Sequence, residues 1–250
     1  MIRIDNVSHS YGAAGVLHDL TLEVPKGCVT ALIGPNGAGK STLLSLIARL
    51  MPLQSGEISV DDMLLGTTDS TELARRLAIL PQASDIAPRL TVEQLVGFGR
   101  FPHSRGRPSI ACLAKIEEAL VRFELIGLRD RLLDTLSGGQ RQRALIAMAF
   151  AQDTDYLLLD EPLNNLDIAA SRSLMRLLRD MVTTDGKTVL IVLHDINYAS
   201  AYAEHIVVLA EGALVAQGTP QEVVTEALLA KAFQTDASVG SHADRPVVFP

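Results

Sequence analysis

The fold is decided by the run Gly34-Pro35-Asn36-Gly37-Ala38-Gly39-Lys40-Ser41-Thr42. This run fits the pattern G-x-x-x-x-G-K-[ST], in which a glycine-rich backbone wraps around phosphate groups. Residues 28–33 before it are mostly apolar and predict a buried strand, and residues 41–50 after it carry leucine and isoleucine at helical spacing. A strand, a glycine turn and a helix N-terminus direct bare N–H groups and the positive end of a helix dipole at one point. We therefore predict that residues 34–42 bind a nucleotide, with Lys40 reaching its β- and γ-phosphates.

Length and composition narrow the class of protein. The 250 residues are 48% hydrophobic and 20% charged, which suits one large α/β domain with a modest subdomain. The net charge of −7 argues against a general nucleic-acid binder and against adhesion to anionic lipid. The apolar runs are too short to span a membrane, and Arg3 and Asp5 interrupt any signal-peptide pattern. Cys28 and Cys112 are too few for a disulfide framework and are expected to be free thiols. We expect a protein of the cytosol, or one that a protein partner holds at a membrane.

Hydrophobic periodicity predicts the order of the secondary-structure elements. Alternating segments near 2–7 and 20–24 and a hairpin over 55–65 predict a small antiparallel layer. Apolar strands followed by helices predict a parallel sheet with right-handed crossovers, with strands at 28–33, 77–80, 156–160 and 188–193. Helical patterns and a loop at 99–108 occupy 83–136, which indicates an inserted helical subdomain. A hairpin near 206–216, a helix capped by Thr219 that runs to about 233, and a loosely held tail at 236–250 complete the prediction.

Two acids follow the apolar run 156–159. Asp160 ends the predicted strand and Glu161 comes directly after it. An acid at the C-terminal end of a parallel strand lies beside the phosphate loop, where Asp160 can hold Mg²⁺ with the Ser41 hydroxyl as a second ligand. Glu161 is then placed to polarise an attacking water as a general base. Two solvated acids at a strand end are the alternative, which the matched loop makes the weaker one.

The run Leu136-Ser137-Gly138-Gly139-Gln140 is the most specific segment of the chain. Ser137 and two glycines before a helix form a second anion-binding helix N-terminus, although one nucleotide per chain needs only one. With this run, the phosphate loop and the paired acids, the chain resembles the nucleotide-binding subunits of ATP-binding cassette (ABC) transporters, from residue 2 to about 233. The resemblance implies a head-to-tail dimer, in which each ATP lies between residues 34–42 of one copy and residues 137–140 of the other.

The resemblance also implies roles for single residues. Tyr11 matches the aromatic residue that stacks on adenine, and Gln82 matches the glutamine that contacts Mg²⁺ and the attacking water. Asp167 is the acid of the loop 164–167 that crosses the dimer interface, and His194 matches the histidine that contacts the γ-phosphate. Structural roles are the alternative, because an edge-strand tyrosine or a lone histidine is often structural.

The expected fold class is α/β: a P-loop NTPase (RecA-like) core with a parallel sheet, a small antiparallel β layer and an inserted α-helical subdomain. One ABC nucleotide-binding domain is expected over 1–250. Its core lies at about 1–82 and 140–235, the helical subdomain at about 83–139 and the C-terminal tail at about 236–250.

The expected function is hydrolysis of ATP, with Mg²⁺, to drive uptake through a separate membrane permease. Residues 98–103 and 161–167 look most like importers of ferric siderophores, with haem and cobalamin as alternatives. The resemblance places the chain at the cytoplasmic face of the inner membrane, bound to permease subunits, with an extracytoplasmic substrate-binding protein as an indirect partner and no nucleic acid.

Three other functions stay open at this point. A soluble cassette ATPase of DNA repair or translation would usually carry two cassettes or a long coiled-coil insertion, and this chain has neither. A P-loop kinase would have no use for residues 136–140. An export cassette would more often be fused to membrane helices.

Overall fold

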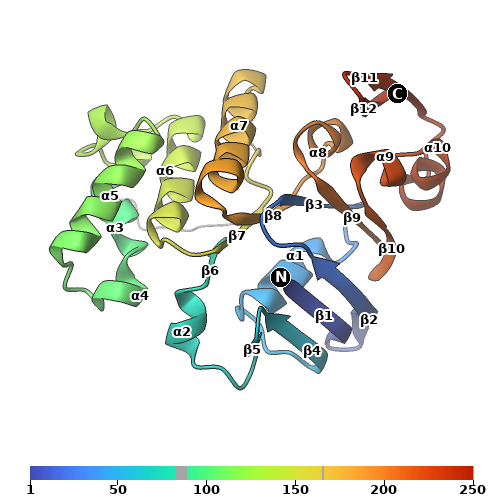
Figure 1. Ribbon diagram of the computed structural model, residues 1–250, viewed down its shortest axis with the longest axis horizontal. Helices are drawn as coiled ribbons and strands as arrows, with labels where there is room; N and C mark the ends of the chain where they lie inside the picture. The colour runs from blue at the N-terminus through green and yellow to red at the C-terminus, as the bar shows by residue number, and fades with distance from the viewer. Residues whose placement is uncertain (83–88, 165, 250) are drawn as a thin grey trace.

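A six-stranded sheet forms the centre of the molecule, between a group of helices and a second sheet (Figure 1). The computed structural model describes residues 1–82, 89–164 and 166–249. Three parts of the predictions lie outside these residues, namely the start of the helical subdomain at 83–88, Asn165 of the interface loop, and Pro250 of the tail. The strands of the central sheet are β3 (Val29–Ile33), β6 (Leu77–Leu80), β7 (Tyr156–Asp160), β8 (Thr188–Val192), β9 (His205–Ala210) and β10 (Ala213–Gly218).

The central sheet is parallel except at one edge. Its order is β10-β9-β3-β8-β7-β6, and every neighbouring pair from β9 to β6 is parallel while β10 runs antiparallel to β9. Strand β8 therefore lies between β7 and β3, the strand that leads into the phosphate loop. This order brings the C-terminal end of β7, with its acids, to the edge of the sheet from which the phosphate loop leaves β3.

One face of the central sheet is covered by α1 (Lys40–Ile47) and by a four-stranded antiparallel sheet. That sheet has the order β2-β1-β4-β5, with β1 (Ile2–Tyr11), β2 (Ala14–Val24), β4 (Ser55–Val60) and β5 (Met63–Leu64). The helix α2 (Ser70–Ala74) then leads back into β6. The prediction of a small antiparallel layer beside the core is confirmed.

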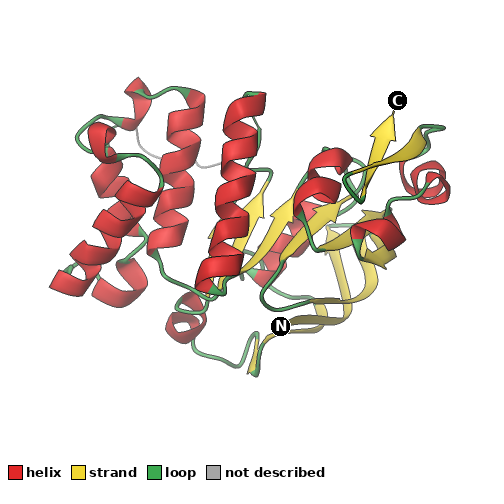
Figure 2. Cartoon of the chain, turned by 45° about the horizontal axis from the view of Figure 1, so that its top comes forward, coloured by secondary structure: helices red, strands yellow, loops and turns green. Residues whose placement is uncertain are grey.

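The other face of the central sheet is covered by helices, as Figure 2 shows. These helices are α6 (Gly138–Ala151), α7 (Ile168–Asp185) and α8 (Ile196–Tyr202). Ala31 and Ile33 of β3 belong to this helical core, whereas Leu32 packs with α1 on the opposite face. Successive side chains of a strand point to opposite faces, so a strand covered on both sides is apolar throughout.

The remaining helices stand together beside the sheet, at the left of Figure 1. They are α3 (Val92–Phe98), α4 (Phe101–Ser104) and α5 (Ile110–Arg122), followed by the 3₁₀ turns η1 (Ile126–Leu128) and η2 (Leu133–Thr135). Part of the loop predicted at 99–108 is therefore helical. Pro102 is compatible with α4 because it lies in the first turn, where its missing N–H has no intrahelical partner to lose.

The C-terminal part differs from the prediction in two ways. The helix expected from Thr219 to about 233 is broken into α9 (Pro220–Val223), α10 (Glu226–Leu228) and the π-helical turn η3 (Leu229–Phe233). The break falls where Thr225 caps a new helix, its side chain accepting a hydrogen bond from the Leu228 N–H at 3.2 Å. The tail is not loosely held, because β11 (Ser238–His242) and β12 (Arg245–Phe249) form a hairpin that hydrogen-bonds to α8.

Candidate nucleotide-binding site

The loop 34–42 is shaped by two glycines that tolerate no side chain. Gly34 has a φ of 150°, and a Cβ there would lie 2.0 Å from the carbonyl oxygen of Leu209. Gly39 has a φ of 94°, and a Cβ there would lie 2.5 Å from Leu17. Gly39 precedes α1 without a side-chain cap, so the first N–H groups of the helix are free to bind a ligand.

Lys40 lies inside the loop rather than in solvent. Its side chain is 5% exposed, and its Nζ donates hydrogen bonds to the carbonyl oxygens of Gly34 at 2.8 Å and Pro35 at 2.9 Å. Burial lowers the pKa of Lys40, although the charges of Glu161 and Asp160 act in the opposite direction. An ammonium group has three donors, so this arrangement leaves one N–H for an anionic ligand that would compensate the burial of the charge.

Asp160 and Ser41 form a pair suited to a hard divalent cation. The Ser41 hydroxyl donates to Asp160 Oδ1 at 3.1 Å, and Asp160 is buried. Burial raises the pKa of Asp160, and the negative charge of Glu161 raises it further, so a cation at this carboxylate would stabilise its ionised form. Among the described residues no cluster of three acidic, histidine or cysteine ligands occurs. Mg²⁺ does not need one, because it is usually held by one or two protein ligands together with substrate phosphates.

Glu161 has an unusual backbone conformation and three side-chain partners. Its φ of 50° is unusual for a residue other than glycine, and such strain often marks functional positions. Its Oε2 accepts hydrogen bonds from Gln82 Nε2 at 2.5 Å and Asn164 Nδ2 at 2.7 Å, and its Oε1 lies 2.7 Å from His194 Nε2. Burial by itself would raise the pKa of Glu161, but His194, Asn164 and Lys40 hold it below its ordinary value. The carboxylate is therefore ionised at neutral pH.

These groups meet in one cavity of about 250 Å³, the phosphate cavity. Asp160 is hydrogen-bonded to Ser41, which lines this cavity, and His194 contacts Glu161, which also lines it. Gly34 and Pro35 contribute the carbonyl groups beneath Lys40. The lining residues are Val16, Asn36, Gly37, Ala38, Gly39, Lys40, Ser41, Thr42, Gln82 and Glu161.

Two residues of the site were missed by sequence reasoning. Val16 lies on β2, and nothing in its sequence context indicates a ligand-binding position. Asn164 was assigned to the interface loop only, yet it binds Glu161. The turn that brings Asn164 back, with its N–H donating to the Glu161 carbonyl at 3.2 Å, could have been suspected from Pro162.

Tyr11 is not among the residues that line the phosphate cavity. It is 53% exposed, its hydroxyl donates to Met51 Sδ at 3.2 Å, and its ring stands edge-on to His9 with centroids 5.2 Å apart. An exposed aromatic face can stack on a base, so its predicted contact with adenine stays a prediction.

Residues 137–140 and Asp167 line a different cavity of about 580 Å³, the Ser137 cavity. Ser137 and Gln140 form a capping box at the start of α6, in which the Gln140 N–H donates to Ser137 Oγ at 3.3 Å. Asp167 caps α7 by accepting from the Ala170 N–H at 2.7 Å. Among the residues that the structure describes, the Ser137 cavity and the phosphate cavity share no lining residue, so one copy of the chain presents them as two separate cavities.

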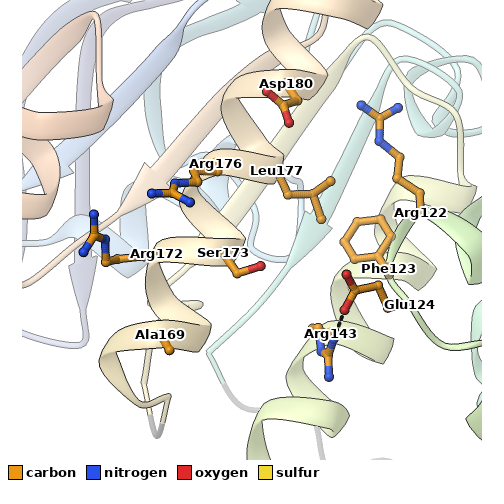
Figure 3. Close-up of a pocket in the computed structure, with 10 residues that line it drawn as sticks. All are labelled: Arg122, Phe123, Glu124, Arg143, Ala169, Arg172, Ser173, Arg176, Leu177 and Asp180. Atoms are coloured by element: carbon orange, nitrogen blue, oxygen red, sulfur yellow. Dashed lines mark hydrogen bonds and ion pairs between the residues drawn. The ribbon is translucent and has the colours of Figure 1, made fainter.

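A third cavity, of about 480 Å³, adjoins the Ser137 cavity and is shown in Figure 3. The two share Arg143, Ala169 and Ser173. In Figure 3 the Arg143 guanidinium donates to Glu124, at 3.0 Å. Leu177 of α7 faces Phe123 across the gap. This cavity marks the boundary between α7 and the helices α5 and α6.

Comparison with known proteins agrees with this geometry. Residues 17–164 match the family model for ABC transporters. The chain is 49% identical over 233 residues to the petrobactin import ATP-binding protein YclP of Bacillus subtilis (strain 168), covering 93% of this chain and 92% of that protein. It is 42% identical over 237 residues to the ferric enterobactin transport ATP-binding protein FepC of Escherichia coli (strain K12), covering 93% and 86%.

A solved structure shows the same fold. The dimeric post-hydrolysis state of the ATP-binding cassette MJ0796, bound to ADP and Pi, superposes with a TM-score of 0.78 at 30% identity, covering 88% of this chain and 98% of that one. The chain belongs to the ABC transporter family and is an ATPase of that class. Every helix in the described part of the chain is too short or too polar to cross a bilayer.

Proposed function

We propose that this chain is the ATP-hydrolysing subunit of an importer for iron(III)-siderophores, acting through a separate membrane permease. The observation that carries the proposal is the phosphate cavity, where Lys40, the Ser41–Asp160 pair and ionised Glu161 surround one space. The cargo class comes from the relatives, since YclP is named for petrobactin import and FepC for ferric enterobactin transport.

We propose a separate role in ATP hydrolysis for each group of residues in and beside the phosphate cavity. Lys40 and the N–H groups of the loop bind the β- and γ-phosphates. Ser41, Asp160 and Gln82 are the residues proposed to hold Mg²⁺, which would supply positive charge against the phosphate oxygens. Glu161 orients the attacking water and takes its proton.

In this proposal Glu161 exchanges one of its partners for the attacking water. Its two oxygens accept from Gln82 and Asn164 and contact His194. We assign His194 the role of exchanging this contact for one with the γ-phosphate, which its 44% exposed side chain permits. The free Oε1 of Glu161 then faces the water.

The working unit is proposed to be a head-to-tail dimer. The separation of the phosphate cavity from the Ser137 cavity supports this, because a second copy can place Ser137, Gly138, Gly139 and Gln140 against the nucleotide of the first. The relative MJ0796 was solved as a dimer with ADP and Pi. The interface would also contain Asp167 and the loop that it ends.

The permease is proposed to dock near α4. Phe98 and Phe101 are 54% and 59% exposed, which makes an apolar surface that a partner can cover. Arg100 between them is buried and donates from Nη1 to the Ala151 carbonyl at 2.7 Å, fixing the turn to the end of α6. Docking there would hold the chain at the cytoplasmic face of the membrane, with the substrate-binding protein on the other side and no nucleic acid involved.

The test is to purify the chain from its own cells with whatever membrane protein accompanies it. Identification of a permease, and ATP hydrolysis that increases when a ferric siderophore is delivered by its binding protein, would support the proposal. Co-purification with ribosomes or DNA, or phosphate transfer to a small acceptor instead of release, would contradict it. Haem and cobalamin serve as competing cargoes in the same assay.

A further inference from the structure

The helix that follows His194 is short and has its own cap. Helix α8 contains 7 residues, and Asp195 Oδ1 accepts hydrogen bonds from the N–H groups of Asn197 at 2.7 Å and Tyr198 at 3.2 Å. Helices of this length are not stable alone, so the position of α8 depends on what packs against it.

The C-terminal hairpin binds α8 through its outer strand edge. Asn197 Oδ1 accepts from the Val248 N–H at 2.8 Å, and Asn197 Nδ2 donates to the Val248 carbonyl at 3.1 Å. The side-chain amide thus makes the two hydrogen bonds that a neighbouring strand would make with Val248. Ser200 Oγ donates to the Pro246 carbonyl at 2.6 Å. The two elements lie close together near the C-terminus in both Figure 1 and Figure 2.

The same strand also binds the other end of α8. The Arg245 guanidinium donates to the carbonyl oxygens of Ser200 at 3.2 Å and Ala203 at 2.8 Å. A cation at the C-terminal end of a helix interacts favourably with the helix dipole and with the last carbonyl groups. Strand β12 thus fixes both ends of α8.

The His194 side chain is held much less firmly than the helix after it. It is 44% exposed, and its contact with Glu161 is the one polar contact found for it among the described residues. A cavity of about 240 Å³ lies beside it, lined in part by Glu161, Asn164 and Tyr198. With open space at its side, the imidazole depends on the backbone at 194–195 for its position.

We propose that the β11–β12 hairpin positions His194, with Asn197 as the positioning residue. The contacts run from Val248 to Asn197, from Asn197 to its cap Asp195, and from there to His194 and the Glu161 carboxylate. This inference rests on the ATPase function and on the role of His194 proposed above. On this inference the hairpin of residues 238–249 contributes to ATP hydrolysis by positioning His194.

The test compares Asn197→Ala with Gln221→Ala in the full chain. Gln221 donates to the Asp244 carbonyl at 2.8 Å, so it binds the turn of the same hairpin from α9, and among the described residues it makes no hydrogen bond to α8. For Asn197→Ala the kcat of ATP hydrolysis should fall about three- to tenfold, which is the rate factor that corresponds to the net free energy of one hydrogen bond. The KM for ATP should stay unchanged within about twofold. Gln221→Ala should match the wild type in both constants.

A second pair of variants separates positioning from loss of stability. In a His194→Ala background, Asn197→Ala should reduce the residual rate of phosphate release no further, because the side chain that it positions is gone. An equal fall in both backgrounds, or wild-type kcat for Asn197→Ala, would overturn the inference while leaving the proposed function intact. Wild-type turnover in His194→Ala alone would instead overturn the proposed role of His194, and this inference with it.

Discussion

Replacement of Glu161 by glutamine tests the proposed general base directly. The amide has almost the same shape as the carboxylate, so its oxygen can still accept from Gln82 and Asn164. Its NH₂ group would face His194 Nε2, which can accept in the other neutral tautomer. Glu161→Gln should therefore preserve the site and remove only the base.

The expected loss can be derived from the state of the carboxylate. Because His194, Asn164 and Lys40 hold the pKa of Glu161 below its ordinary value, the wild-type side chain is almost wholly ionised at neutral pH. Loss of a positioned base lowers the rate by about 10²–10⁴-fold, or about 3–5 kcal/mol in activation free energy. ATP affinity should stay within about twofold, since Lys40 and the loop are untouched.

The assay is phosphate release at saturating ATP, with nucleotide binding and dimer content measured on the same samples. The variant should bind ATP and accumulate the dimer. Glu211→Gln is a matched control, because Glu211 also follows a strand of the central sheet and also has a φ of 50°. Near-normal turnover in Glu161→Gln would remove Glu161 from its assigned role, and equal losses in both variants would point to a general effect of removing a carboxylate charge rather than to loss of a base.

Three further predictions concern the loop and the N-terminal region. Lys40→Ala should abolish ATP binding in a calorimetric titration, because the buried ammonium is the charge proposed to bind the phosphates; wild-type affinity would refute the loop assignment. Gly34→Ala should lower the free energy of unfolding by about 3 kcal/mol or more, since its Cβ would overlap the Leu209 carbonyl, whereas Gly37→Ala, with open space around it, should cost only about 1 kcal/mol in the same denaturant titration. Hydrogen bonds from the N-terminal amine and from a buried tyrosine outweigh burial and lower the pKa of Asp61 to about 2. A lowered folded-state pKa stabilises the protein above the unfolded value of about 4, and this stabilisation is lost as the pH falls through about 2. Asp61→Asn should thus be less stable than the wild type at neutral pH, with a difference that narrows below about pH 4 in unfolding curves; a difference independent of pH would contradict this.

Sequence reasoning predicted the central fold because its signals are local. The pattern of residues 34–42 needs only a strand before it and a helix after it, and both are present as β3 and α1. Apolar runs ending in acid likewise predicted β7 and the approach of Asp160 to Ser41. Prediction failed at the C-terminus, where α8 was not foreseen and residues 236–250 were expected to be loose. The hairpin there is held by contacts to residues about fifty positions earlier, which leave no periodic pattern in the chain.

The sequence by itself was enough to predict the chemistry: a phosphate-binding loop, a carboxylate proposed for a cation, a carboxylate proposed for a water and a second helix start proposed to bind an anion. Each depends on residue types at fixed short spacing, so each can be read from the chain alone. Only the tertiary structure decided how these groups stand to one another. It brings Gln82, Asn164 and His194 into contact with the Glu161 carboxylate, and it places Ser137 in a cavity separate from that of the phosphate loop. Such relations depend on the packing of elements that are distant in sequence, because close-packed side chains fix where each strand end and each helix N-terminus can lie.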